Sequence, residues 1–142
     1  MSPTLIQAGR IAEGVLVEAR ARGAKPLGVI VLDAGGHPIV YQREDGASLF
    51  RFDIARAKAL GALGMGADTR EIAARAASNP AFFTSVAVAT GGGLALSAGG
   101  VLIGGEGKIV GAVGVSGDTP DTDEACALAG IAAAGFNHGV QS

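Results

Sequence analysis

The sequence has little cysteine, little charge and few aromatic residues. Cys126 is the one cysteine among 142 residues, which excludes an internal disulfide and makes an oxidising compartment unnecessary. Charged residues make up 17% of the chain, against roughly 25% in an average globular domain. The formal net charge of −2 shows no excess of lysine and arginine. The composition therefore argues against a nucleic-acid partner and against a polybasic membrane anchor.

Long hydrophobic runs are also missing. No uninterrupted apolar stretch reaches about 18 residues, so the sequence predicts no membrane-spanning helix. Residues 1–4 lack the basic start and the apolar stretch of a secretory signal. We therefore expect a cytoplasmic protein with no membrane partner.

Apolar residues and glycine are abundant instead. Hydrophobic residues make up 49% of the chain, which also holds 24 glycines. A chain of this length fits one domain over residues 1–142, with a core that needs no disulfides. Because a monomer rarely exposes apolar patches beyond a few hundred Å², we expect a homo-oligomer that holds a small molecule where its subunits meet.

Four segments have the apolar spacing of helices. Thr4 caps the first, which ends before Gly23. The others are predicted over residues 52–63, 68–77 and 121–136, and Asn79-Pro80 is expected to stop the third. Residues 81–90 give no clear prediction.

Five short apolar runs predict strands. Residues 27–32 and 38–43 form an antiparallel hairpin around the turn at residues 33–36. Three further runs, at residues 94–96, 101–103 and 109–115, are separated by glycines and predict a meander. The last run has almost no side-chain bulk at Gly111, Ala112 and Gly114, so another element must approach its backbone closely. The prediction is an α/β (α+β) fold, a five-stranded antiparallel sheet flanked by helices.

Charged residues gather between the hairpin and the second helix, in a chain otherwise short of charge. They are Arg43, Asp45, Arg51, Asp53 and Lys58. Arginine and lysine bind carboxylates, and a nearby aspartate acts as a base or an acceptor. A solvated surface with ordinary salt bridges explains the same cluster equally well.

An acidic loop at residues 117–124 precedes the last helix. Helix capping explains most of its acids, and metal binding is the alternative. Asp123 is the acid that we expect to face a pocket. The glycines at residues 91–93 lack the spacing of a phosphate-binding loop, so close packing is the favoured interpretation. His37 and His138 are expected at the surface, and Cys126 as a buried, inert thiol.

Four motifs taken in order resemble the GlcG/HbpS family, also called the haem-degrading or DUF336 domain. They lie at residues 31–36, 43–47, 55–59 and 111–117, and Asp123-Glu124 follows them. The resemblance implies a profilin-like α-β-α domain, frequently an octamer. Some relatives bind haem, and others form the C-terminal domain of a cobalamin adenosyltransferase-like protein. The first helix here has no histidine and places Glu13 and Glu18 five residues apart, unlike haem-binding relatives.

Three functions follow as hypotheses. The first is an oligomer that binds a small ligand, with haem or another tetrapyrrole as the candidate and no metal assigned. Its pocket is predicted from Arg43, Asp45, Arg51, Lys58, Gly92, Gly93 and Asp123. The second is a cofactor-free lyase, tautomerase or hydrolase for a small oxo- or hydroxy-acid, with Lys58 and Asp45 as the catalytic acid and base. The third is an accessory protein whose role is assembly.

Overall fold

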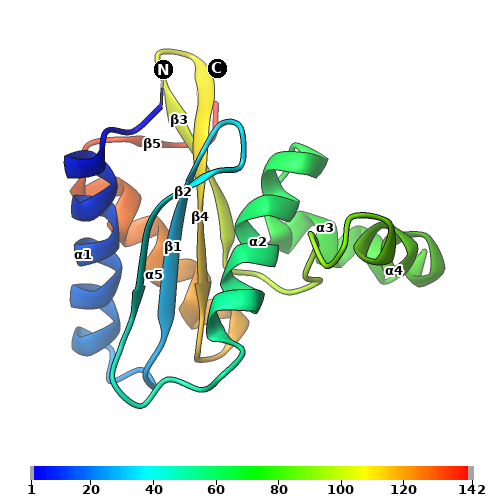
Figure 1. Cartoon of the computed structure of the whole chain (residues 1–142), viewed down its shortest axis with the longest axis horizontal. Helices are drawn as coiled ribbons and strands as arrows, with labels where there is room; N and C mark the ends of the chain where they lie inside the picture. The colour runs from blue at the N-terminus through cyan, green and yellow to red at the C-terminus, as the bar shows by residue number, and fades with distance from the viewer. Residues whose placement is uncertain (1, 141–142) are drawn as a thin grey trace.

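The computed structural model describes residues 2–140, which form helices and strands in a mixed order (Figure 1). The helices are α1 (Leu5–Ala21), α2 (Arg51–Met65), α3 (Thr69–Ala76), α4 (Pro80–Ala89) and α5 (Pro120–Ala133). The strands are β1 (Gly28–Asp33), β2 (Pro38–Arg43), β3 (Gly100–Gly105), β4 (Lys108–Ser116) and β5 (Asn137–His138). The predicted five-stranded α/β fold is confirmed.

The sheet lies between two layers of helices. Its strands follow the order β2-β1-β4-β3-β5, and every neighbouring pair is antiparallel. Helices α1 and α5 cover one face, and α2 covers the other, with α3 and α4 beyond it (Figure 1). Because β1 and β4 are central and covered on both faces, nearly all of their residues are buried.

Local sequence explains where the first and last helices begin. Thr4 caps α1 through its hydroxyl, which accepts from the backbone of Gln7, and the Gln7 side chain accepts from the backbone of Thr4. Thr119 caps α5 in the same way, by accepting from the backbone of Thr122. Both helices start within one residue of the predicted positions.

Glycines let the helices lie close to the sheet and to each other. A Cβ atom added at Gly114 in β4 would lie 1.9 Å from the carbonyl oxygen of Ala55 in α2. In the other helical layer, a Cβ at Gly130 would lie 2.5 Å from the carbonyl oxygen of Ile11. The predicted close approach to the last long strand is thus confirmed, and the element that makes it is α2.

Two parts of the fold differ from the prediction. Residues 94–96 form no strand, because Leu94 is buried with Phe83 and α3 in a separate apolar cluster. The fifth strand is β5 instead, which pairs His138 with Ile103 at the edge of β3. The segment after Asn79 is also helical, since Pro80 occupies the first turn of α4, where a missing N–H costs nothing.

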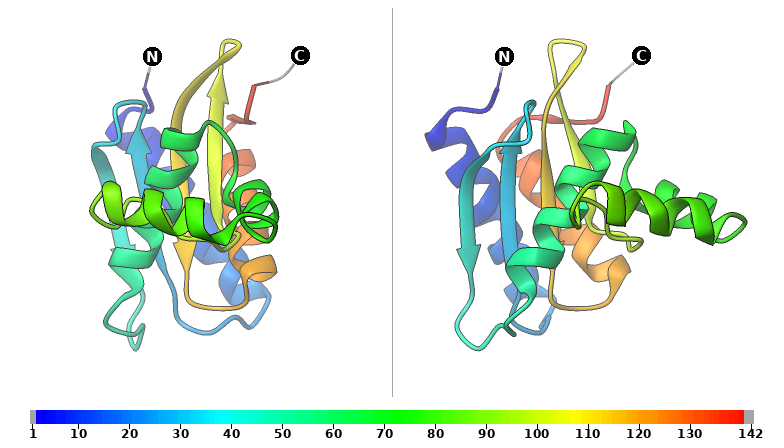
Figure 2. Two further views of the ribbon diagram at one scale, coloured as in Figure 1. Left: turned by 90° about the vertical axis from the view of Figure 1, so that its right-hand side faces the viewer. Right: turned by 45° about the vertical axis from the view of Figure 1, so that its right-hand side comes forward.

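Helix α4 projects away from the body of the domain (Figure 2). Its ten residues carry no charge, yet Phe83 is its one buried residue. Phe82 and Val88 are exposed by 50% and 77%. Among residues 2–140, none of the helices combines the length and the hydropathy needed to cross a bilayer.

Candidate functional site

Most of the predicted site residues lie at one end of the sheet. The connections between α1 and β1, between β2 and α2, and between β4 and α5 meet there, at the lower end in Figure 1. The hairpin turn that joins β1 to β2 lies at the opposite end. The topology thus brings together side chains that are far apart in the sequence.

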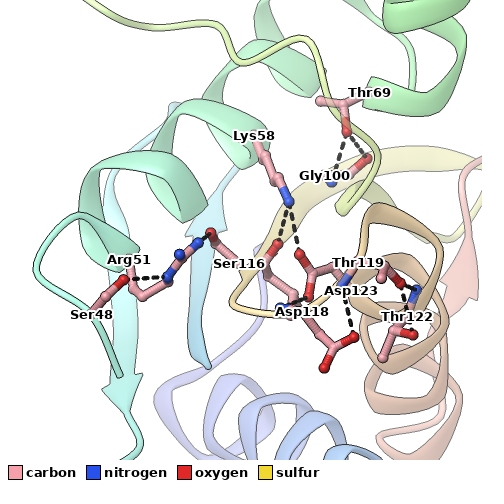
Figure 3. Close-up of polar contacts among 11 residues, drawn as sticks. Ser48, Arg51, Lys58, Thr69, Gly100, Ser116, Asp118, Thr119, Thr122 and Asp123 are labelled. Atoms are coloured by element: carbon pink, nitrogen blue, oxygen red, sulfur yellow. Dashed lines mark hydrogen bonds and ion pairs between the residues drawn. The ribbon is translucent and has the colours of Figure 1, made fainter. Parts of the chain in front are cut away.

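Arg51 is the first residue of α2, and two hydroxyl groups hold its guanidinium (Figure 3). Its Nε donates to Oγ of Ser48, and its Nη1 donates to Oγ of Ser116, each at 2.8 Å. Gly28 makes room for this approach, because a Cβ there would lie 3.3 Å from Cβ of Arg51 and 2.9 Å from the hydroxyl of Tyr41. Arg51 is therefore positioned by neutral partners.

Lys58 and Asp123 form a buried ion pair beneath the same region (Figure 3). The Lys58 Nζ lies 3.1 Å from Oδ2 of Asp123 and also donates to the carbonyl oxygen of Val115 at 2.9 Å. Burial lowers the pKa of Lys58, an effect that Asp123 opposes and the charge of Arg51 adds to. The pair is closed to solvent, since each residue is 2% exposed.

Backbone groups fix the acids of the loop before α5. Asp123 Oδ1 accepts from the N–H of Asp118 at 2.9 Å, and Asp118 Oδ2 accepts from the N–H of Lys25 at 2.7 Å. Hydrogen bonds from the backbone of Lys25 and Thr119 lower the pKa of Asp118. Within residues 2–140, no group of three or more histidine, cysteine, aspartate or glutamate side chains is arranged to hold a metal. Asp118 and Asp123 therefore hold the loop through backbone N–H groups, whereas Asp121 and Glu124 bind the guanidinium of Arg70.

Two adjoining hollows open at this end of the domain. The larger hollow has a volume of about 470 Å³ and is lined by Arg20, Pro26, Arg43, Glu44 and Asp45. The smaller hollow has a volume of about 200 Å³ and is lined by Lys25, Pro26, Gly46, Ser48, Arg51 and Gly117. Pro26 belongs to both. Glu44 binds the guanidinium of Arg20 at 2.8 and 3.0 Å, so Arg43 and Asp45 are the remaining charges of the larger hollow.

The structure divides the predicted site residues into three groups. Arg43, Asp45 and Arg51 line the hollows. Lys58 and Asp123 lie in the interior as a pair. The third group, Gly92 and Gly93, follows α4 and lies outside both hollows, with Gly93 against the side chain of Thr90.

Sequence reasoning missed the glycines that approach Lys58. A Cβ at Gly99 would lie 2.8 Å from Lys58 Nζ, and one at Gly100 would lie 2.2 Å from the Lys58 carbonyl oxygen. The signal in the sequence was the pair of adjacent glycines before a predicted strand. The residue that they approach, Lys58 in α2, is more than 40 residues away in the sequence, so no local pattern connects them.

The histidines and the cysteine lie away from the hollows. His37 is on the hairpin turn, 80% exposed, with Nδ1 3.3 Å from Oδ1 of Asp33. His138 contacts Asp68 through Nε2. Cys126 is buried in α5, and burial raises the pKa of its thiol to about 11. The predicted burial of the thiol is confirmed.

Comparisons with known proteins identify relatives of the whole chain. A family model described as "Haem degrading protein HbpS-like" matches residues 4–132. No curated protein matches in sequence. The crystal structure of a double mutant of Streptomyces reticuli HbpS is 32% identical, with a TM-score of 0.80 over 93% of this chain and 86% of that chain.

Two further solved structures share the fold. The Klebsiella pneumoniae protein ORFY, described under DUF336, is 26% identical, with a TM-score of 0.84 over 92% of this chain and 89% of that chain. The PduOC:heme complex is 23% identical, with a TM-score of 0.87 over the full length of both chains, which supports the fold alone. The family match and the likeness to HbpS show that this chain belongs to the HbpS-like family of haem-degrading proteins.

Proposed function

We propose that this chain is a small-ligand-binding protein of the HbpS type, that its ligand is an organic anion of the haem or tetrapyrrole class, and that it works as a homo-oligomer. The observation that carries the proposal is the pair of hollows joined at Pro26. Three cationic residues, Lys25, Arg43 and Arg51, line them, and within residues 2–140 neither arginine of the three forms an ion pair with a carboxylate.

The size and charge of the hollows suit a ligand with carboxylates. Small-molecule sites are typically clefts of roughly 300–1,000 Å³, and the larger hollow has about 470 Å³. Guanidinium groups bind carboxylates through charge-assisted hydrogen bonds, which are about twice as strong as neutral ones. The propionate groups of a tetrapyrrole fit this chemistry.

Within residues 2–140, these hollows offer none of the usual axial ligands of haem iron, since no histidine, cysteine or methionine lines them. His37 lies on the hairpin turn at the other end of the sheet, and His138, which belongs to β5, lies beside Asp68. Cys126 is buried, and its thiol has a raised pKa. We therefore propose that carboxylates, rather than the metal, carry recognition by this site.

Exposed apolar side chains support the homo-oligomer. Large hydrophobic residues are exposed on α1, just before α2 and on α4, and groups of such residues mark interaction surfaces. They include Leu5, Ile6, Val17, Leu49, Phe50, Phe82 and Val88. A second copy of the chain that covers these surfaces would also enclose the open hollows, in the manner of the octamer that the family resemblance implies.

The alternative hypothesis, a cofactor-free enzyme that uses Lys58 and Asp45, has less support than ligand binding. Lys58 Nζ already donates to Val115 and Asp123 and is closed to solvent, whereas Asp45 lies in the larger hollow. A substrate would have to reach Lys58 through the interior. Turnover of a small oxo-acid that disappears in Lys58→Ala but persists in Asp123→Asn would favour the enzyme.

Titration with haem and with iron-free protoporphyrin IX tests the proposal. We expect the oligomer to bind both, with comparable affinities by absorbance and fluorescence, because the two compounds share their carboxylates. Variants His37→Ala and His138→Ala should leave the affinity for protoporphyrin IX unchanged. Failure to bind either compound would refute ligand binding of this class. Binding of haem alone, with loss in either histidine variant, would refute recognition through carboxylates.

A further inference from the structure

The smaller hollow contains a half-buried cation, Arg51, for which residues 2–140 supply no counter-ion. Two of the five N–H donors of Arg51 are used, and both acceptors are neutral hydroxyls. Among the described residues, no carboxylate pairs with it. Withdrawing a charge from water is unfavourable unless an opposite charge compensates it. The remaining three donors therefore favour an anion from outside the chain.

The charges around Arg51 do not compensate it. Lys25 lines the same hollow and adds a second positive charge. Asp123 is engaged by Lys58, and Asp118 accepts from backbone N–H groups. Arg51 also acts on Lys58, because its charge contributes to the lowered pKa of that lysine. The charges of Lys25 and Arg20 act on Asp118 and contribute to its lowered pKa, so that carboxylate is engaged by those residues rather than by Arg51.

The guanidinium is held ready for a ligand. Ser116 ends β4, is 1% exposed and pairs in register with Gly28 of β1, so its hydroxyl is a fixed anchor. Ser48 fixes the Nε side through the second hydrogen bond. Anchors of this kind reduce the conformational entropy that a flexible arginine would lose on binding.

We infer that the smaller hollow is a carboxylate subsite, in which Arg51 binds one carboxylate of the ligand through two parallel N–H donors while Lys25 adds charge. This inference rests on the proposed function and names the group that the site recognises. A planar carboxylate matches the arginine fork, and a volume of about 200 Å³ admits a head group rather than a whole tetrapyrrole.

The surroundings indicate an apolar body on the same ligand. Leu49 and Phe50 precede Arg51 in the sequence and are exposed by 81% and 63%. Pro26 forms an apolar boundary between the smaller hollow and the larger one. The ligand class is therefore an amphipathic carboxylic acid, with its carboxylate at Arg51 and its apolar part across Pro26.

Protoporphyrin IX and its dimethyl ester are the probes that test this inference. We expect the wild-type oligomer to bind the free acid more tightly than the ester, by roughly ten- to a hundredfold, the effect of losing a charge-assisted pair. Arg51→Gln should weaken binding of the free acid by a similar factor and leave the ester unaffected. Arg51→Lys should give an intermediate loss, since it keeps the charge without the fork.

Arg56→Gln is the matched control, because Arg56 lies on the same helix, lines neither hollow and carries the same charge. It should bind like the wild type. Full affinity for the free acid in Arg51→Gln would overturn the subsite and leave the proposed function intact, whereas equal binding of acid and ester would overturn both the subsite and recognition through carboxylates. The comparison of acid with ester uses the wild type, so it decides the question even where a variant fails to fold.

A second measurement separates the inference from the proposed function. Benzoate is titrated into the ¹⁵N-labelled oligomer, and the amide signals of Gly46, Ser48 and Gly117 are followed by NMR. We expect shifts at these positions that disappear in Arg51→Gln, even if no porphyrin binds at all. Absence of these shifts in the wild type, or equal shifts with inorganic phosphate at the same concentration, would overturn the carboxylate assignment.

Discussion

Lys58 and Asp123 join the two faces of the sheet through a single buried contact. Their charged atoms lie 3.1 Å apart, and α2 and α5, which carry them, pack on opposite faces. The third partner is the carbonyl oxygen of Val115, at the end of β4. The contact therefore fixes the end of the sheet at which the hollows open.

Removing one member of this pair should strongly destabilise the domain. Lys58→Met leaves the carboxylate of Asp123 buried without a cation, which typically costs about 3–5 kcal/mol. Asp123→Asn removes the charge but keeps an acceptor for the N–H of Asp118. We expect the double variant, Lys58→Met with Asp123→Asn, to be more stable than Lys58→Met alone. Urea unfolding of the four proteins measures the coupling, and losses that simply add would contradict it.

A second prediction concerns acid stability. Hydrogen bonds from the backbone hold the pKa of Asp118 below its usual value of 3.8. The folded state therefore favours the ionised form, and this contribution is fully present above pH 3.8. It is lost as the pH falls through the lower pKa of the folded state. We expect the stability difference between the wild type and Asp118→Asn to be constant near pH 6 and to shrink in acid.

Thermal unfolding between pH 6 and pH 2 measures that difference. Other acids with a lowered pKa, such as Asp33, are present in both proteins and cancel in the comparison. A gap in unfolding temperature that stays constant down to pH 2 would show that Asp118 does not titrate with folding.

Two glycines of the α1 and α5 layer should respond to alanine in opposite directions. A Cβ at Gly130 would lie 2.5 Å from both the carbonyl oxygen of Ile11 and Cγ2 of Val15, whereas a Cβ at Gly9 meets nothing within 4 Å. Gly130→Ala should therefore destabilise the domain by about 1–3 kcal/mol or more through overpacking. Gly9→Ala should stabilise it by about 0.5–1 kcal/mol, because alanine loses less backbone entropy in a helix.

Denaturant unfolding of both variants, each compared with the wild type, checks these signs. A neutral Gly130→Ala would mean that the two helices separate at little cost. Loss of stability in Gly9→Ala would mean that the outer face of α1 is covered in the assembled protein.

Local patterns were sufficient to predict most of the elements. The Thr4 cap, the β1–β2 hairpin and the acids that begin α5 each specify structure within a few residues. Helix α4 was missed because Pro80 looks like the end of one helix, although it begins another. Strand β5 was missed because Asn137 and His138 are polar, and only Ile103 and Gly104 across the sheet make them a strand.

For the candidate site too, the sequence predicted residues that are neighbours along the chain and missed contacts between distant ones. The cluster of Arg43, Asp45 and Arg51 was predictable, because these residues are close in the sequence and unusual in a chain with 17% charge. The contact of Lys58 with Asp123 spans 65 residues, and no local spacing encodes that Lys58 would be buried rather than open to a ligand. The hydroxyl of Ser116 as the anchor of Arg51 depends on the pairing of β4 with β1.

The last prediction concerns assembly through α4. Phe82 and Val88 are exposed on a helix that has no charge and projects from the domain, so each subunit presents apolar surface to water. We expect Phe82→Asp combined with Val88→Asp to lower the oligomer mass measured by native mass spectrometry. The double variant should keep the helix content of the wild type, since neither side chain belongs to the core.

Thr84→Asp, which adds a charge at another exposed position of α4, is the control and should keep the mass unchanged. A wild type that is monomeric at micromolar concentration would contradict assembly altogether. An unchanged mass in the double variant would move the interface to the exposed side chains of α1 and of the start of α2.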